Sequence, residues 1–308
     1  MKNGHPKARP FLKWAGGKTQ LLDAIAQRLP PELEGGEITR YVEPFSGSGA
    51  VFFHIVRHFT LAELFILDSN EELILAYRAL KRHCDAVVET LRSLQTDYFQ
   101  LPPEDQKLFY YKLRQNFNET REAVDFERET PGLAGVKRTA QLIFLNRTCY
   151  NGLFRVNSKG AFNVPFGSYK NPTICDEENL NAVAEVLQRT HIILGDFETS
   201  RTYIHPQTFV YFDPPYRPLN KTSSFTSYAV RPFDDTEQVR LAKFYSSLNE
   251  SGAKLMLSNS DPRNENAADD FFDRLYAGFT IHRVRANRMI NSQPAGRGLI
   301  NELLITNY

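Results

Sequence analysis

The stretch Phe209-Val210-Tyr211-Phe212-Asp213-Pro214-Pro215-Tyr216 is the segment around which we expect the fold to be organised. Its first four residues are apolar and aromatic, a pattern typical of a buried β-strand. Neither Pro214 nor Pro215 has a backbone N–H, so the hydrogen-bond ladder of the strand has to end there. The sequence therefore predicts that Asp213 and Tyr216 are held rigidly at the carboxyl end of a strand, where open α/β sheets bind ligands.

The residues after this strand suit the binding of an amino group on a flat ring. An oxygen of Asp213 and the carbonyl of Pro214 can each accept a hydrogen bond from an exocyclic NH2 group, and the ring of Tyr216 can stack on a base. They indicate a site for amino-group methylation on a nucleic-acid base, with Asp213, Pro214 and Tyr216 as candidate catalytic residues. The simpler alternative is a strand followed by a Pro-Pro turn, with an N-capping Asp213 and a packed Tyr216.

Composition bounds the class of protein more than its function. The chain has 308 residues, of which 42% are hydrophobic and 24% charged, which fits one large domain or a catalytic domain with an insertion. We expect a cytoplasmic protein, because no apolar run approaches membrane-spanning length and the first residues hold no apolar signal region. The cysteines Cys84, Cys149 and Cys175 form no CxxC pair, and the seven histidines show no HExxH spacing, which predicts reduced cysteines and no metal.

Charge is unevenly distributed along a chain whose net charge is only +1. Between Pro131 and Pro172 there is no Asp or Glu, whereas there are six basic residues. These are Lys137, Arg138, Arg147, Arg155, Lys159 and Lys170. An acid-free basic segment in a nearly neutral protein indicates local contact with a polyanion, although a solvated basic face would have the same composition.

Two glycine-bearing segments lie near the N-terminus. The first, 11–19, ends in Gly-Lys-Thr like a phosphate loop, but Leu12 stands where that motif needs a glycine, so we exclude a P-loop. The second, 41–53, reads as a strand, a turn containing Gly47 and Gly49, and an apolar helix, the layout that brings backbone N–H groups to a cofactor. Asp68 ends the following strand, where it can accept a hydrogen bond from a ribose hydroxyl or cap the next helix.

From about Leu73 to Val186 the strand–helix alternation gives way to helical stretches at 73–94, 106–116 and 137–145. Within this region, Asn157-Ser158-Lys159-Gly160 predicts the turn of a hairpin. Its Arg, Asn, Tyr and Leu side chains suit entry into a major groove, but exposed hairpins of other proteins carry them too. Afterwards we expect strands at 191–194, 253–260, 280–284 and 299–306, and a helix at 237–248. A Ser/Thr-rich loop at 222–228 could close over a substrate or contact phosphates, and a flexible surface loop would equally have this composition.

Together these segments resemble the Dam-type DNA adenine-N6 methyltransferases of the alpha group. The shared motifs run nearly end to end: FLKWAGGK at 11–18, VEPFSGSGAVF at 42–52, YNGLFRVNSKGAFNVPFG at 150–167, GDF at 195–197, FVYFDPPY at 209–216, FTSY at 225–228, LSNS at 257–260 and GRGLINELLITNY at 296–308. Each motif alone is modest, whereas all of them in this order are highly specific.

The resemblance implies an α/β fold: a Rossmann-like, seven-stranded S-adenosylmethionine-dependent methyltransferase sheet, with an inserted, mainly helical target-recognition domain that carries a β-hairpin. Residues 1–72 and 187–308 would form the catalytic domain, and residues 73–186 the DNA-binding domain. The implied reaction transfers a methyl group from S-adenosyl-L-methionine to adenine N6 in double-stranded DNA, by base flipping and direct in-line transfer, leaving S-adenosyl-L-homocysteine. GATC is the implied target; another GAT-containing site, or a non-catalytic DNA-binding relative, is the alternative.

The resemblance also assigns residues by their motif positions. The implied cofactor contacts are Trp14, Ala15, Gly17, Lys18, Phe45, Gly47, Gly49, Asp68, Asp196, Phe197 and Asp213, with Asp68 at the ribose and Asp196 and Phe197 at the adenine. The implied DNA contacts are Lys13, Arg147, Tyr150, Asn151, Leu153, Arg155, Asn157 and Pro165, of which Lys13 and Arg155 match positions that read guanines. No metal is implied, a restriction endonuclease as functional partner is left open, and we expect a monomer or a weak dimer.

Overall fold

The structure is a computed structural model that describes residues 7–14, 18–217, 233–287 and 299–308. Two of the expected cofactor contacts, Ala15 and Gly17, lie outside the described residues, as does the Ser/Thr-rich loop at 222–228. Their expected roles therefore stay predictions.

The described residues form one mixed sheet of seven strands in the order β3-β2-β1-β4-β5-β7-β6. The strands are β1 (Arg40–Glu43), β2 (Glu63–Asp68), β3 (Thr190–Leu194), β4 (Thr208–Phe212), β5 (Lys254–Ser260), β6 (Thr280–Asn287) and β7 (Leu299–Thr306). Strands β1 to β5 are parallel, and β7 runs antiparallel between β5 and β6. This confirms the expected α/β sheet. Its chain order reverses between β1 and β4, the kind of switch point at which such sheets bind ligands.

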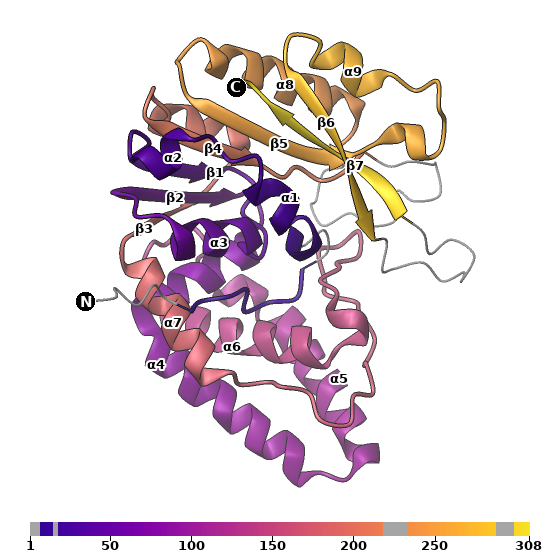
Figure 1. Ribbon diagram of the computed structural model, residues 1–308. Coiled ribbons are helices and arrows are strands. Elements are labelled where there is room, and N and C mark those ends of the chain that lie inside the picture. The colour runs from indigo at the N-terminus through magenta and orange to yellow at the C-terminus, as the bar shows by residue number, and fades with distance from the viewer. Residues whose placement is uncertain (1–6, 15–17, 218–232, 288–298) are drawn as a thin grey trace.

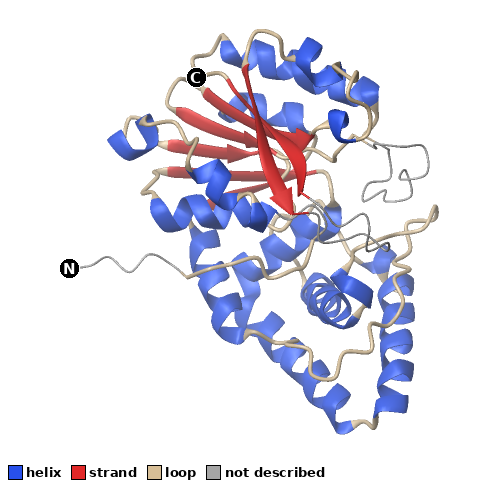
Figure 2. Ribbon diagram, turned by 45° about the vertical axis from the view of Figure 1, so that its right-hand side comes forward, coloured by secondary structure: helices blue, strands red, loops and turns tan. Residues whose placement is uncertain are grey.

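The central strands are apolar because both of their faces are covered by helices (Figure 2). On one face, Tyr41, Phe209 and Tyr211 join the core with α3 (Ala50–His58). On the other face, alternate residues such as Val42 and Val210 pack with α8 (Asp235–Asn249) and α9 (Phe271–Leu275). The period of two along each strand assigns successive side chains to opposite cores.

A helical body lies beside the sheet and fills the lower half of Figure 1. It consists of α4 (Glu71–Gln100), α5 (Pro103–Glu119), α6 (Leu133–Thr148) and α7 (Glu177–Gln188). The three helical stretches expected between 73 and 145 are confirmed, each longer than predicted. Helix α4 is capped by Asn70, whose side chain accepts hydrogen bonds from the backbone N–H groups of Glu72 and Leu73 at 3.0 and 3.2 Å. Asn70, rather than Asp68, is therefore the N-cap.

The remaining helices are short. They are η1 (Lys18–Gln20), α1 (Leu22–Ala26), α2 (Glu32–Gly35), η2 (Arg121–Ala123), η3 (Tyr150–Gly152), η4 (Phe197–Tyr203) and η6 (Pro262–Asn264). In the described part of the chain, none of the helices is long and apolar enough to cross a membrane.

The segment 146–167 begins in the last turn of α6 and folds back on itself before α7. Isolated antiparallel bridges join Cys149 to Phe166 and Val156 to Phe162, and no regular strand forms in this segment, all of which is described. At the tip, the N–H of Gly160 donates to the carbonyl of Asn157 at 2.9 Å, and Gly160 has a φ of 75°. The predicted turn is present, but the chain returns through single bridges rather than through a strand pair.

Candidate active site at the carboxyl edge of the sheet

The carboxyl ends of four neighbouring parallel strands carry or immediately precede acidic residues. Glu43 and Asp68 end β1 and β2, Asp213 follows β4, and Asp196 lies two residues beyond β3. Since these strands are parallel and adjacent, their ends meet along one edge of the sheet. The three acidic residues expected from the sequence, Asp68, Asp196 and Asp213, therefore lie along one edge of the sheet together with Glu43.

Asp213 is paired with a lysine in a nearly buried setting. The Nζ of Lys18 lies 2.6 Å from Oδ1 of Asp213, and the two side chains are 5% and 20% exposed. Ser258 on β5 donates a hydrogen bond to the same oxygen at 3.1 Å and itself accepts one from the hydroxyl of Tyr211 at 2.9 Å. Burial raises the pKa of Asp213, whereas the ammonium of Lys18 and the Ser258 hydroxyl oppose that rise by stabilising the carboxylate.

Tyr216 is held at both ends of its side chain. Its hydroxyl donates to Oε2 of Glu302 on β7, and the Nζ of Lys18 lies 4.4 Å from the centre of its ring. The turn before it is fixed as well, because the side chain of Gln238 on α8 donates to the carbonyl of Pro215 at 3.0 Å. The Asp-Pro-Pro-Tyr turn is thus braced by β7 and α8, and the alternative of an N-capping Asp213 does not describe its contacts.

The glycine turn after β1 leaves no room for side chains. Gly47 and Gly49 have φ values of 45° and 74°, and a Cβ on Gly47 would lie 3.3 Å from the ring of Trp14. Oδ2 of Asp68 accepts a hydrogen bond from the Gly47 N–H at 2.9 Å, and its Oδ1 accepts one from Asn70 N at 2.9 Å. Burial raises the pKa of Asp68 to about 6, although these backbone donors oppose the rise.

An aromatic cluster lies between the ends of β1 and β3. The ring centre of Phe45 is 5.5 Å from that of Phe197 and 5.7 Å from that of Phe233. Next to it, Asp196 receives hydrogen bonds from Arg240 on α8 at 2.7 and 3.0 Å. A nucleoside cofactor requires rings that contact its flat base and oxygens that accept hydrogen bonds from its amino and hydroxyl groups. The aromatic cluster, the carboxylate beside the glycine turn and the carboxylate beside the rings fit that requirement.

Glu43, at the end of β1, is the most deeply buried of these acids, with 2% exposure. Burial raises its pKa well above the ordinary value, and the hydroxyl of Tyr41 donates to Oε2 of its carboxyl. Among the described residues, no group of three or more His, Cys, Asp or Glu side chains is arranged to hold a metal ion.

Lys13 lies beside the folded-back segment 146–167. Its backbone exchanges two hydrogen bonds of 2.8 Å with the side chain of buried Asn146, which also donates to the carbonyl of Gly152 at 3.0 Å. The rings of Trp14 and Phe154 stack with their centres 5.0 Å apart. The N-terminal motif and the expected DNA-reading segment are therefore fixed to each other, although they are more than 130 residues apart in sequence.

The expected DNA contacts differ in how accessible they are. Tyr150, Asn151, Arg155, Asn157 and Pro165 are exposed, and Leu153 is half-buried. The Nε of Arg155 donates to Oδ1 of Asn163 at 2.8 Å, which orients its guanidinium.

Two residues of the acid-free basic segment have structural partners. The Nη2 of Arg147, which is half-buried, donates to the carbonyl of Phe11 at 2.7 Å, so its role at DNA stays a prediction. Arg138 is buried against Glu72. Fewer positive charges of this segment are therefore available to a polyanion than its composition indicates.

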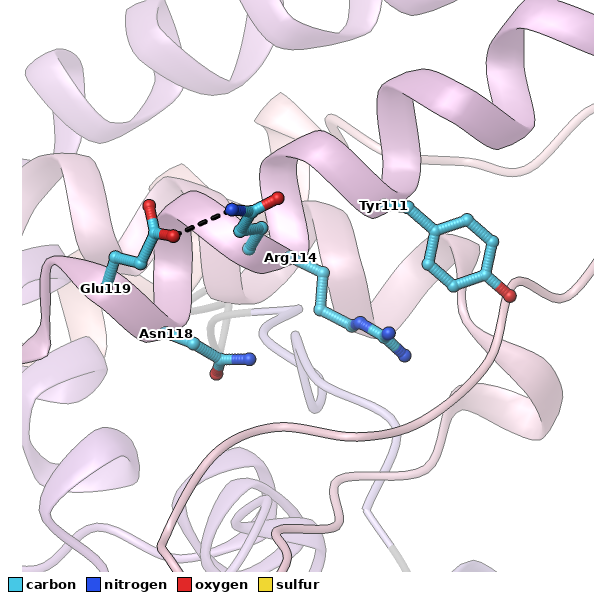
Figure 3. A pocket seen from close by; sticks show the side chains of 5 residues that line it. Tyr111, Arg114, Asn118 and Glu119 are labelled. Carbon is cyan, nitrogen blue, oxygen red and sulfur yellow. Dashed lines mark hydrogen bonds between the residues drawn. The ribbon is translucent and has the colours of Figure 1, made fainter.

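A separate pocket of about 430 Å³ lies along α5 (Figure 3), lined by Tyr111, Arg114, Gln115, Asn118 and Glu119. Arg114 and Asn118 also hold the folded-back segment, through bonds of 2.9 and 3.1 Å to the carbonyls of Val164 and Phe162. None of the residues at the strand ends lines this pocket. We therefore regard this pocket as part of the helical body and not of the candidate site.

Five residues of the site were not singled out from the sequence: Glu43, Phe233, Arg240, Ser258 and Glu302. Three of them lie in motifs that the resemblance covers, Glu43 in VEPFSGSGAVF, Ser258 in LSNS and Glu302 in the C-terminal motif. A polar side chain directly beside an apolar residue of a strand was the available signal for these three. Nothing in the local sequence distinguishes Phe233 or Arg240.

Comparison with known proteins agrees with this geometry. The model of the D12 class N6 adenine-specific DNA methyltransferases matches residues 14–290. The chain is 51% identical over 98% of its length to the whole of the Type II methyltransferase M.MjaIII of Methanocaldococcus jannaschii. It is 38% identical over 97% of its length to 95% of the Type II methyltransferase M1.LlaDCHI of Lactococcus lactis, and 35% identical, with the same coverage, to a DNA adenine methylase of Vibrio cholerae.

Proposed function

Because the chain belongs to the D12 class of N6 adenine-specific DNA methyltransferases, we propose that it methylates adenine N6 within GATC sites of double-stranded DNA, with S-adenosyl-L-methionine as the donor. The observation that carries this proposal is the position of Asp213. Its carboxylate lies at the switch point of the sheet, on the same edge as the glycine turn, and contacts the ammonium of Lys18 that also lies over the ring of Tyr216.

The residues that would hold the donor lie along the ends of β1, β2 and β3. Phe45 and Phe197 would contact its adenine, Asp196 would accept from the adenine amino group, and Asp68 would accept from the ribose. Gly47 and Gly49 allow the backbone to approach, and Trp14 and Lys18 would complete the contacts at the other end. When bound, S-adenosyl-L-methionine supplies an electrophilic methyl group for direct transfer to an amine.

The target adenine has to leave the duplex to reach Asp213, at a cost of a few kcal/mol. Stacking on Tyr216 returns roughly 1–3 kcal/mol of that cost, and the exposed ring of Tyr150 is available to fill the gap in the DNA. Asp213 and the carbonyl of Pro214 then accept hydrogen bonds from the two amino N–H groups, which directs the nitrogen lone pair away from the ring plane. After the methyl group has been transferred, one of these N–H protons leaves and S-adenosyl-L-homocysteine is released. Holding the amine in this orientation is the main catalytic contribution of the protein.

Sequence recognition is assigned to the helical body and the segment 146–167, as an inserted domain spanning residues 73–186. Arg155 and Lys13 would each read a guanine, since Arg and Lys are the side chains that pair best with guanine O6 and N7. Asn151, Leu153, Asn157 and Pro165 would contact neighbouring bases or the backbone. Another GAT-containing site is the alternative target.

Two relatives are named Type II methyltransferases, which supports pairing of this enzyme with a restriction endonuclease that cuts the same site. Relatives named DNA adenine methylase leave room for an enzyme that acts alone. We take the active form to be a monomer or a weak dimer.

The test is to methylate plasmid DNA in vitro with radiolabelled donor and to map the modified adenines. The proposal requires N6-methyladenine at GATC, and methylation confined to another GAT-containing site would replace GATC while leaving the chemistry intact.

The variant Asp213→Ala should lose turnover by at least about a hundredfold while retaining part of its donor binding. Wild-type turnover by that variant would contradict the catalytic assignment.

A further inference from the structure

Arg240 makes a two-pronged contact with Asp196 at the edge of the proposed donor site. The Nη1 of Arg240 lies 3.0 Å from Oδ1 of Asp196, and its Nη2 lies 2.7 Å from Oδ2. The carbon of the same guanidinium lies 4.1 Å from the ring centre of Phe197, the residue that follows Asp196. One side chain on α8 thus fixes both neighbouring residues that would contact the donor adenine.

Arg240 is also the cation at the centre of three carboxylates. Besides Asp196, its guanidinium contacts Glu237 at 2.7 Å and Glu198 at 3.2 Å. Oδ1 of Asp196 accepts a further hydrogen bond from the backbone N–H of Glu198 at 3.0 Å. Because a carboxylate offers about four acceptor positions, Asp196 keeps room for one more donor, and its side chain is still 48% exposed.

We propose that Arg240 is a positioning residue for the methyl donor, which holds the Asp196 carboxylate and the Phe197 ring in the arrangement that receives the adenine of S-adenosyl-L-methionine. This inference rests on the proposed function, because it takes Asp196 and Phe197 as the adenine contacts. It adds a residue of α8 that touches neither the donor nor the target base and acts through the residues that do.

The physical expectation follows from the charges. Without Arg240, Glu198 and Glu237 repel Asp196, and the carboxylate loses both guanidinium hydrogen bonds while keeping the one from the backbone N–H of Glu198. The Phe197 ring loses the cation that covers one side of it. Donor affinity should therefore fall, whereas the rate of methyl transfer at saturating donor should change little, since Asp213 and Tyr216 are held by other contacts.

The experiment measures binding of S-adenosyl-L-methionine and of S-adenosyl-L-homocysteine by isothermal titration calorimetry. We expect Arg240→Ala to raise both dissociation constants about fivefold to twentyfold, a loss typical of charge-assisted hydrogen bonds. Arg240→Lys keeps the positive charge but not the planar two-pronged donor, so its dissociation constants should lie between those of the wild type and those of Arg240→Ala. In steady-state assays the KM for the donor should rise in the same order, with kcat within about twofold of the wild type.

Arg201→Ala is the matched control. Arg201 also lies over an aromatic ring, with its guanidinium carbon 4.9 Å from the centre of Phe244, but its Nη2 donates to Ser247 at 2.7 Å. Equal donor affinities in Arg201→Ala and Arg240→Ala would overturn the inference. If Arg240→Ala does not fold, a wild-type affinity for the donor in Arg240→Lys would overturn the inference instead.

Asp196→Ala separates this inference from the proposal beneath it. Weaker donor binding in Asp196→Ala together with wild-type binding in Arg240→Ala would overturn the role of Arg240 alone. Wild-type donor binding in Asp196→Ala would instead remove the adenine contact from the proposed function, and the inference with it.

Discussion

The ammonium nitrogen of Lys18 lies 2.6 Å from Oδ1 of Asp213 and 4.4 Å from the ring centre of Tyr216. A cation in this position counteracts the burial of Asp213, which on its own raises the pKa of that carboxyl. The same ammonium contacts both the carboxylate of Asp213 and the aromatic face of Tyr216. In the proposed mechanism the flipped adenine needs the same two groups, the carboxylate for its amino group and the aromatic face for its ring.

Lys18→Met should shift the pH dependence of methyl transfer. Removing the cation raises the pKa of Asp213 further, so the carboxylate becomes protonated at a higher pH. The acidic limb of the pH–rate profile should then move to higher pH, and turnover near neutral pH should fall. Single-turnover rates measured across the pH range test this. Lys254→Met is the matched control, because Lys254 forms an ion pair of the same length, 2.6 Å, with Glu32 rather than with a residue of the site.

Glu302→Ala should impair turnover through Tyr216. The hydroxyl of Tyr216 donates to Glu302, so loss of the carboxylate frees the ring that is proposed to stack on the adenine. We expect a reduction of about tenfold in kcat, the scale of a lost hydrogen bond of roughly 1–1.5 kcal/mol. Glu302→Gln keeps an acceptor and should lose much less. If the contact is responsible, Tyr216→Phe and Glu302→Ala will not be additive in the double variant.

Arg155→Ala should relax sequence choice rather than abolish methylation. Arg155 is exposed, and its Nε is held by Asn163, which leaves the rest of the guanidinium available for a guanine. Losing a two-pronged guanine contact should reduce discrimination at that base by about 1–3 kcal/mol. The measurement is the ratio of methylation rates on duplexes with and without the guanine. An unchanged ratio would remove Arg155 from the reading role, and Asn163→Ala should show a smaller change in the same direction.

The sequence predicted the position of a candidate site residue where a local pattern marks the end of a strand. Two prolines after four apolar residues located Asp213 and Tyr216 at a strand end, and the glycine turn and Asp68 were found by the same reasoning. Each of these features is signalled by residues within a few positions of one another, and the order of the parallel strands then brings the features to one edge.

Contacts between distant elements were not predictable in this way. Glu302 reaches Tyr216 from 86 residues away because β7 is inserted beside β5. Arg240 reaches Asp196 across 44 residues from α8. Neither pairing leaves a trace in spacing or periodicity. The basic segment 131–172 is a further example, because its composition does not reveal that Arg138 is paired with Glu72, which lies 66 residues earlier.

Donor binding should weaken as the pH falls through about 6. Burial raises the pKa of Asp68 to about 6, so this carboxylate is ionised at neutral pH and protonated a little below. If only the ionised form binds the donor ribose well, the dissociation constant at pH 5 should be roughly tenfold higher than at neutral pH, as expected one pH unit below the pKa. Calorimetry from pH 5 to 8 tests this. Asp68→Asn should bind weakly throughout but without that dependence, and an equally steep dependence in this variant would assign the proton to another group.

Arg138→Ala should be the most destabilising change in the basic segment. The Nε of Arg138 lies 2.8 and 3.0 Å from the two carboxylate oxygens of Glu72, and its guanidinium carbon lies 3.8 Å from the ring centre of Phe117. Both partners are buried, with side-chain exposures of 2% and 10%. Removing the arginine leaves an unpaired buried carboxylate, which should lower the free energy of unfolding by about 3–5 kcal/mol. Urea denaturation measures this loss.

The adjacent Lys137→Ala removes the same charge from an exposed position, and its free energy of unfolding should stay within about 0.5 kcal/mol of the wild type. Similar losses in the two variants would show that net charge, rather than the buried pair, stabilises α4 against α6.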